Sequence, residues 1–356
     1  MSVMIAAVHI PTKVYLGFGV SNLLGAELVA AGVKNALIIA DEAVDANLLN
    51  ALKTRVTSFN VLVSVQSLNF PEVTLDNIKE LAKLMDRWEA VIAVGKGVTL
   101  DLVKSAAGRK ASLITIPTPP GIENAITRST LPPMGLRKMK TQNVYPYLAL
   151  LDPNLAVRLD AFSVAASIIE TLANSLEIFA SRKTNLFSLT LAEAALREVA
   201  SVKLSGERVE ELEGLQAYTA ALYAGLANDQ VGGAALKALT HAFYALYGLP
   251  PYKTLATLLI PWLKRLHEVS SEQGSRVFHP SFTPSFTENL VEWIEKLLIE
   301  YNFVTTLREL GVKPKTLDLV VEYAWTYEYY LVLNDVTVAD KYSLREILEA
   351  ASGKSA

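Results

Sequence analysis

The stretch Ala93-Val94-Gly95-Lys96-Gly97-Val98-Thr99-Leu100-Asp101 joins a run of apolar residues, Ala90–Val94, to a helical pattern that ends near Gly108. The apolar run predicts a buried strand, and Thr99–Gly108 predicts a helix. Backbone N–H groups at the start of a helix attract anions, and glycines let a phosphate approach the backbone closely. The stretch therefore predicts one of two things: a seat for a nucleotide pyrophosphate, or a tight strand-to-helix turn that binds no ligand.

Strands and helices alternate on both sides of this turn. Thr74 is placed as the N-cap of one of the helices, because its side chain precedes a helical pattern. This alternation predicts a Rossmann-like α/β domain, in which helices cover both faces of a parallel sheet. The predicted strands are Val14–Leu16, Ala36–Ala40, Asn60–Val65, Ala90–Val94, Ser112–Pro117 and Tyr147–Leu151, and the predicted helices are Ser21–Ala31, Thr74–Trp88 and Thr99–Gly108.

The pattern changes after Asp152-Pro153. From about Leu155 onward the periodicity is helical, interrupted by a Ser-, Gly- and Pro-containing loop at Ser270–Pro284. We therefore expect two domains, a nucleotide-binding α/β domain over 1–154 and an all-α domain over 155–356. The predicted helices of the second domain are Phe162–Ser181, Leu186–Val202, Val209–Leu226, Ala234–Tyr247, Tyr252–His267, Phe286–Leu310, Leu317–Val332 and Ser343–Ser352.

The composition excludes several classes of protein. The chain has 356 residues, of which 51% are hydrophobic, and a net charge of -3. This charge gives no reason to expect nucleic acid or an anionic membrane as a partner. The absence of cysteine excludes disulfides, iron–sulfur clusters and cysteine nucleophiles. No basic leader or continuous apolar span is apparent, so we expect a cytoplasmic protein that acts on a small molecule.

The glycine turn resembles the phosphate-binding turn of the iron-type (group III) alcohol dehydrogenases, whose superfamily includes the dehydroquinate synthases. In that family the turn reads Gly-Gly-Gly-Ser, followed by an Asp and a later Lys. Lys96 and Val98 stand here in place of a Gly and the Ser. Lys96 either attracts the phosphate or obstructs its approach, and Val98 lacks the hydroxyl. The family residues that remain in register are Gly95, Gly97, Asp101 and Lys104.

Three further segments carry the resemblance, the first being Leu16-Gly17-Phe18-Gly19, which resembles the family's N-terminal Phe-Gly-x-Gly strand end. Ile38-Ile39-Ala40-Asp41 is similar to the strand whose final Asp lies near the adenosine ribose. A carboxylate there favours NAD over NADP, since it repels a 2′-phosphate. The alternative for Asp41 is a helix N-cap. Pro117–Gly121 resembles the loop over the nicotinamide, with Thr118 retained and the family's Glu replaced by Ala125. The resemblance thus implies an NAD or NADP site that includes Thr118.

The metal site of the family is altered. Iron-type enzymes bind a divalent metal through an Asp and a His four residues apart on one helix, followed by two more His. The four matching positions here are Glu170, Asn174, Lys237 and Pro251. A protonated lysine has no lone pair, and proline has no side-chain ligand. We therefore expect no tightly bound metal.

Two interpretations of these substitutions remain open. In one, the Lys237 ammonium replaces the metal and polarises a carbonyl or protonates an alkoxide, held by an ion pair with Glu170 while His241 relays protons. In the other, Lys237 and Glu170 merely pair, and His241 is a core histidine.

The first interpretation predicts a metal-independent NAD(P)-dependent oxidoreductase acting on a small carbonyl or alcohol in the interdomain cleft. The second predicts a catalytically retired nucleotide-binding or assembly protein. A dehydroquinate synthase-like lyase is a third possibility, and the lost histidines disfavour it. The family's tendency to pair through the N-terminal domain implies a homodimer.

Overall fold

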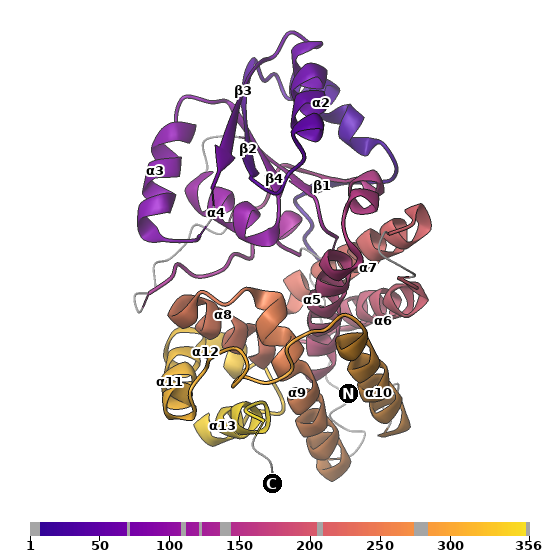
Figure 1. The fold of residues 1–356 in the computed structure, drawn as a ribbon, viewed down its shortest axis with the longest axis vertical. Coiled ribbons are helices and arrows are strands. Elements are labelled where there is room, and N and C mark those ends of the chain that lie inside the picture. Colours follow the sequence, from indigo (N-terminus) through magenta and orange to yellow (C-terminus); the bar gives the residue numbers. More distant parts are fainter. Residues whose placement is uncertain are drawn as a thin grey trace.

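The computed structural model describes residues 8–69, 72–107, 112–120, 123–135, 144–204, 209–273 and 284–353. Within them, the earlier part of the sequence forms one sheet with its helices, and the later part forms a helical half below it in Figure 1. All the strands lie between Lys13 and Leu151. An α/β first half followed by an all-helical second half is therefore the observed fold class, as the sequence predicts.

The sheet is parallel throughout, with strand order β1-β6-β5-β4-β2-β3. Parallel strands need crossover connections, which the helices between them supply. Each predicted strand is confirmed, although β3 begins two residues later than the pattern indicated. The strands are β1 (Lys13–Leu16), β2 (Asn35–Asp41), β3 (Leu62–Leu68), β4 (Ala90–Gly95), β5 (Ser112–Pro117) and β6 (Leu148–Leu151).

Helices cover both faces of the sheet, and β2 shows how. Ala36, Ile38 and Ala40 pack into one core cluster, whereas Leu37 and Ile39 pack into the other. This two-residue alternation is the geometry of a strand buried on both faces. The first cluster contains α1 (Leu24–Ala30) and α2 (Ala46–Thr57). The second contains α3 (Leu75–Met85) and α4 (Gly97–Ala107) and continues into the helical half.

In the α/β half, one predicted helix cap is confirmed and one helix was not predicted. Thr74 is the N-cap of α3, and its hydroxyl accepts a hydrogen bond from the Asn77 N–H. Helix α2 was not predicted from the sequence. Its N-cap is Asp45, whose carboxylate accepts from the Asn47 N–H, and its buried face is only Leu48, Leu52 and Val56. Such a narrow apolar stripe gives a weak periodic signal.

The helical half contains each predicted helix, with altered ends. The helix predicted over Phe286–Leu310 ends at Glu300, and that over Leu317–Val332 is divided between α11 and α12. Of the predicted loop Ser270–Pro284, the first residues belong to α9 and 274–283 lie outside the described residues. The helices are α5 (Ala161–Ala180), α6 (Leu186–Ser201), α7 (Glu211–Val231), α8 (Ala235–Tyr247), α9 (Pro251–Gln273), α10 (Pro284–Glu300), α11 (Leu317–Tyr327), α12 (Tyr329–Val332) and α13 (Lys341–Ala350).

Helix α5 is the central helix of this half. In the described part of the chain it is the one helix that is long and apolar enough to cross a membrane. Its apolar window is 78% buried inside the protein, and it packs against α6, α7 and α9. Its length and composition are therefore those of a core helix, and its inner face carries Glu170 and Glu177 towards the α/β half.

Candidate functional site

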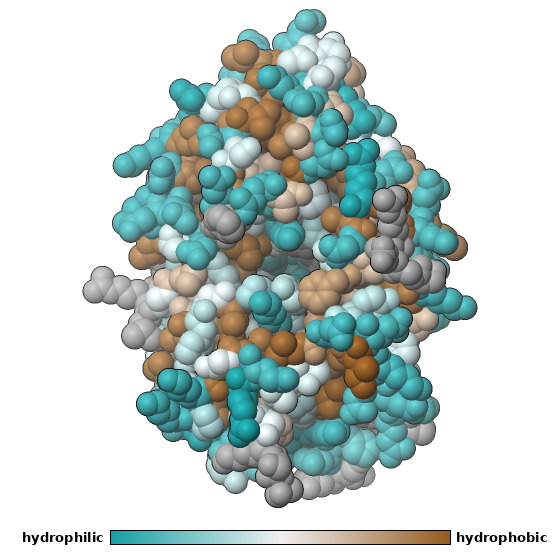
Figure 2. All heavy atoms as spheres, in the orientation of Figure 1, coloured by the Kyte–Doolittle hydropathy of each residue, from teal (hydrophilic) through white to brown (hydrophobic). Residues whose placement is uncertain are grey.

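A cleft of about 520 Å³ lies between the two halves of the molecule. It is lined by residues that follow β2 and β4, by the start of α4, and by α5, α8 and the start of α9. Figure 2 shows a hollow in the molecular surface between the two halves. Ligands of open α/β sheets bind outside the carboxyl ends of the strands. The cleft thus joins the glycine turn at one end to the positions of the family's metal ligands at the other.

The start of α8 is held by a carboxylate from α5 and one from the loop after α12. Its N-cap, Ala234, has no side chain able to accept a hydrogen bond. Instead, Glu177 of α5 accepts from the N–H groups of Ala234 (3.0 Å) and Lys237 (2.9 Å), and Asp335 accepts from the Ala235 N–H (3.1 Å). Because free N–H groups at a helix start favour negative charge, these contacts fix the first turn of α8, and with it Lys237, at the cleft.

Lys237 forms an ion pair with Glu123, at the start of the short 3₁₀ helix η2 (Glu123–Ala125). Its ammonium also donates to the Asn228 side chain at 3.2 Å. Burial alone would lower the pKa of Lys237, but the charge and hydrogen bond of Glu123 outweigh burial and raise it. The predicted pairing of Lys237 with Glu170 is therefore wrong. The reason is that η2 brings Glu123 from the other half of the molecule onto the ammonium.

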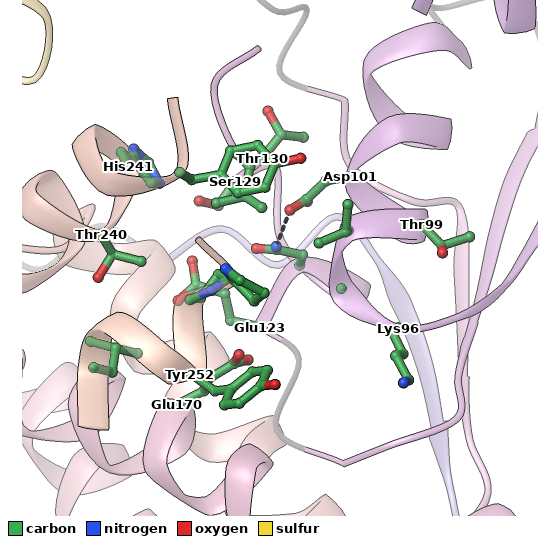
Figure 3. Close-up of a pocket in the computed structure, with 18 of the residues that line it drawn as sticks. Lys96, Thr99, Asp101, Glu123, Ser129, Thr130, Glu170, Thr240, His241 and Tyr252 are labelled. Carbon is green, nitrogen blue, oxygen red and sulfur yellow. Dashed lines mark hydrogen bonds between the residues drawn. The ribbon is translucent and has the colours of Figure 1, made fainter. Parts of the chain in front are cut away.

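Glu170 lies on α5 beside Tyr252, on the opposite side of the cleft from Lys96 (Figure 3). Burial, followed by the charges of Asp101 and Glu123, raises the pKa of Glu170 to about 8, against a smaller opposing effect of the Tyr252 N–H. These surroundings favour the protonated form of the Glu170 carboxyl group. The site thus holds a fixed cation, Lys237, and a separate proton donor, Glu170.

The remaining residues of the predicted catalytic and metal set also line the cleft: His241, Asn174 and Pro251. His241 is on α8, one turn after Lys237, and is 7% exposed. Its Nδ1 lies 3.4 Å from a carboxylate oxygen of Glu328. The structure therefore brings His241 to the cleft, and its surroundings also suit a core histidine.

These side chains do not fit a divalent metal. The four positions offer a carboxyl, an amide, an ammonium already paired with Glu123, and a proline. Zinc and iron(II) need several carboxylate or imidazole donors around one point. Among the residues that the structure describes, no group of three or more His, Asp or Glu is placed to hold a metal ion.

The glycine turn is capped from within the protein. The Asp41 carboxylate, at the end of β2, accepts hydrogen bonds from the Lys96 N–H and the Thr99 hydroxyl, both at 2.9 Å, and from the Ala43 N–H at 3.1 Å. Gly95 has φ 138°, and a Cβ there would overlap this carboxylate. Asp41 thus caps the start of α4, which follows β4, and does not cap α2, the helix that follows Asp41 in the sequence.

The turn still fits an anion. Helix α4 begins at Gly97, and the N–H groups of its first turn have no partner within the helix. Gly97, Val98 and the Lys96 side chain line the cleft beside them. A phosphate at this point would gain from the N–H groups and the Lys96 charge and would be repelled by Asp41. The turn can therefore still accommodate the phosphates of a dinucleotide, but the charge of Asp41 makes this binding weaker.

Three residues assigned to the cofactor by resemblance have other surroundings. Lys104 is fully buried and donates to the carbonyls of Asn124 (2.8 Å), Thr127 (2.7 Å) and Ser129 (2.5 Å). Thr118 lies behind the cleft, and its carbonyl accepts from the Tyr218 hydroxyl at 2.8 Å. Neither lines the cleft, so both act by holding the loop after β5. Asp101 does line it, and accepts from the Asn124 amide at 2.7 Å.

Glu123 is the functional residue that the sequence did not reveal. The family's loop carries a Glu at the position of Ala125, and its loss indicated a missing carboxylate. Glu123 stands two residues earlier, on the same short 3₁₀ helix. The sequence does offer one signal for this residue, because a carboxylate stands two residues before the expected position. Only the turn of η2 shows that Glu123 reaches the cleft.

These features describe one fold, with a dinucleotide-type α/β half and a helical half that closes over the carboxyl ends of the strands. The sequence profile of the iron-containing alcohol dehydrogenases matches residues 11–153. Alcohol dehydrogenase 4 of Schizosaccharomyces pombe is 22% identical over 352 residues, covering 90% of this chain and 83% of its own. Choline dehydrogenase of Bacillus subtilis is 23% identical over 350 residues, covering 87% and 86%.

A solved structure agrees over the whole length. Sulfoacetaldehyde reductase of Bifidobacterium kashiwanohense, in complex with NAD+, superposes with a TM-score of 0.84 at 16% identity. The match covers 99% of this chain and 100% of that one. The profile match and these relatives support placing this chain in the iron-type alcohol dehydrogenase superfamily. Within it, this chain carries Lys237 and Pro251 where the family resemblance places histidine ligands.

Proposed function

We propose that the protein is a nicotinamide-dependent oxidoreductase that interconverts a small carbonyl compound and its alcohol in the cleft, without a bound divalent metal. The observation that carries this proposal is the buried ion pair of Lys237 and Glu123 in the cleft that Glu170 also lines, where burial raises the pKa of Glu170 to about 8. Together they supply, from side chains, the positive charge and the proton that carbonyl reduction requires.

Lys237 is suited to stabilise charge on oxygen. Its pKa is raised by Glu123, so it stays an ammonium over the working pH range. Glu123 and Asn228 hold the ammonium of Lys237, and its backbone lies in the first turn of α8. The ammonium therefore needs no reorganisation when a carbonyl oxygen becomes negative. Because its proton is held so firmly, Lys237 serves as an electrostatic group, and the proton comes from elsewhere.

Glu170 is suited to move that proton. A carboxyl group with a pKa of about 8 is protonated at neutral pH yet ionises within reach of it, which is the condition for general acid–base work. In reduction, the nicotinamide cofactor supplies a hydride to the carbonyl carbon. Glu170 gives its proton to the oxygen, becomes a carboxylate and regains a proton from water. Alcohol oxidation is the reverse, with ionised Glu170 as the base.

The cofactor would be held by its phosphates at the start of α4, next to Lys96 and Gly97. Asp41 would disfavour a 2′-phosphate more than a 2′-hydroxyl, so NAD is the preferred form. The NAD+ in the complex of the sulfoacetaldehyde reductase supports this choice. Relatives named for choline and for sulfoacetaldehyde act on a cation and an anion, so membership of the superfamily leaves the charge of the substrate open.

The test is binding and turnover of the purified protein after treatment with EDTA. We expect micromolar binding of NADH by calorimetry, weaker binding of NADPH, and oxidation of NADH by small aldehydes or ketones. Lys237→Met should reduce turnover while NADH binding persists, and Lys264→Met, a change at an exposed lysine of α9, should leave both intact. Failure to bind either dinucleotide, or activity that returns only with zinc or iron, would refute the proposal.

One observation favours a second candidate, a nucleotide-binding or assembly protein without catalysis. The Asp41 carboxylate already takes the Lys96 N–H, which in a phosphate-binding turn would face the anion. If the turn serves only to join β4 to α4, then neither dinucleotide binds and Lys237→Met changes stability alone. The same calorimetric titration therefore separates the two candidates.

A further inference from the structure

The charge of the cleft is strongly one-sided. Its lining holds seven aspartates and glutamates against two lysines, Lys96 and Lys237. Lys237 is already paired with Glu123, and Lys96 stands at the glycine turn, far along the cleft from Glu170 (Figure 3). At the reaction end of the cleft, burial favours the protonated form of Glu170. The carboxylates of Asp101 and Glu123 face the cleft there, with Lys237 and the buried Lys104 as the nearby cations.

One of these carboxylates has a free oxygen. Glu123 is 6% exposed and uses one oxygen for Lys237. Its second oxygen, Oε2, is buried and has no hydrogen-bond partner within the described ranges of the chain. A buried acceptor without a donor costs free energy that a bound donor would recover. Since Glu123 lines the cleft, that donor can come from a ligand.

Asp101 faces the same space from α4. It is fully buried, with the Asn124 amide on one oxygen. Burial and the charge of Glu123 raise its pKa to about 7, although Lys104, the Leu131 N–H and Lys237 oppose the rise. The charges of Asp101 and Glu123, which come from the neighbouring elements α4 and η2, thus oppose each other. A cation placed between them would remove this repulsion.

We propose that the substrate carries a primary ammonium group, bound by Glu123 and Asp101 with its alcohol or carbonyl carbon towards Glu170. An ammonium supplies a positive charge for two carboxylates and N–H donors for the free oxygen of Glu123. A neutral alcohol supplies neither in full, and an anion would be repelled. The inference rests on the proposed function for its reaction, but the recognition of an ammonium is independent of turnover.

The probes are four small molecules that share a hydroxymethyl group: ethanolamine, n-propanol, glycolate and choline. Calorimetric titration of the full chain, with and without NAD+, measures each affinity. We expect ethanolamine to bind at least about tenfold more tightly than n-propanol, as one charge-assisted hydrogen bond implies. Glycolate should not bind, and choline, a cation without N–H donors, should bind more weakly than ethanolamine. Equal binding of ethanolamine and n-propanol would overturn the proposal, and equal binding of choline would overturn the role of the N–H donors.

Variants locate the site. Asp101→Asn and Glu123→Gln should each weaken ethanolamine by about tenfold, a larger loss than either causes for n-propanol. Glu295→Gln, at an exposed glutamate of α10, should change neither affinity. Because Glu123→Gln also leaves Lys237 without its partner, Asp101→Asn is the decisive variant if the former folds poorly. Unchanged ethanolamine affinity in Asp101→Asn would place the ammonium elsewhere and refute the assignment.

The outcomes separate this inference from the proposed function. NAD+-dependent oxidation of n-propanol without binding of ethanolamine would keep the oxidoreductase and remove the ammonium site. Binding of ethanolamine that depends on Asp101, without any change in the absorbance of NADH, would keep the ammonium site and remove the oxidoreductase.

Discussion

Lys237 and Glu123 form a buried ion pair across the cleft, between side chains 114 positions apart in the sequence. The lysine comes from the first turn of α8 and the glutamate from the loop that follows β5. The pair therefore ties the helical half to the α/β half at the position where the family holds its metal. Both the stability of the interface and the charge of the site depend on it.

Removing the lysine should destabilise the protein. In Lys237→Met the Glu123 carboxylate stays buried without its counter-ion, and we expect a loss of about 3–5 kcal/mol, measured by urea unfolding at neutral pH. The double variant Lys237→Met/Glu123→Gln should recover most of this loss, because the uncompensated charge is then absent. If the single and double variants unfold at the same urea concentration, the ion pair makes no special contribution.

Neutralising Asp41 should strengthen dinucleotide binding. Asp41→Asn keeps an oxygen that can accept from the Lys96 N–H but removes the charge beside the phosphate seat, and we expect NADH to bind roughly fivefold to tenfold more tightly. The gain should be larger for NADPH, which carries an additional phosphate. Calorimetry at two salt concentrations measures both. Weaker NADH binding would show instead that the carboxylate contacts the adenosine ribose.

The stability of the protein should fall as the pH rises from 5 to about 7.5. The pKa of Glu170 is raised from its ordinary value of 4.5 to about 8, so within this window the folded state binds a proton that the unfolded state has lost. Asp101 and Glu177, both raised to about 7, act in the same direction. Glu170→Gln removes one of these groups. The free energy of unfolding of this variant minus that of the parent should increase by about 1–2 kcal/mol between pH 5 and neutral pH. This difference is smaller than the full pKa shift would give, because Glu170 stays partly open to the cleft. Glu295→Gln should show no such trend.

Lys104 should prove to be a positioning residue. In Lys104→Met three carbonyls of the loop after β5 lose their donor and Asp101 loses the charge that lowers its pKa, so we expect a loss of about 3–5 kcal/mol. NADH should bind more weakly only to the extent that this loop moves, and Lys104→Arg should restore little because the buried space fits an ammonium. A Lys104→Met protein of normal stability with abolished NADH binding would indicate direct contact with the cofactor.

Much of the fold could be predicted from local pattern. Buried strands such as Ala90–Val94 are continuous apolar runs, and the long helices of the second half bury wide apolar faces, so both give strong periodic signals. Helix α2 was missed because its buried stripe is narrow. The split between α11 and α12 was missed because a break of one residue does not disturb the average periodicity.

The candidate site divides along a different line. The residue types of the site follow from the sequence alone: Lys237 and Pro251 cannot serve as metal ligands in any conformation, because the donor chemistry belongs to the side chain itself. The register of Gly95, Gly97 and Asp101 likewise places the turn at a strand end. These conclusions required only the order of residues and their chemistry.

The partners of those residues were decided by the tertiary structure. Lys237 pairs with Glu123 and not with Glu170. The Asp41 carboxylate accepts a hydrogen bond from the Lys96 N–H. Both contacts form because loops after different strands converge at one edge of the sheet. The raised pKa of Glu170 has the same origin, since it depends on burial and on carboxylates brought from α4 and η2. Charge and hydrogen bonding act through space over a few ångströms, so they depend on which distant segments meet, and sequence spacing does not encode that distance.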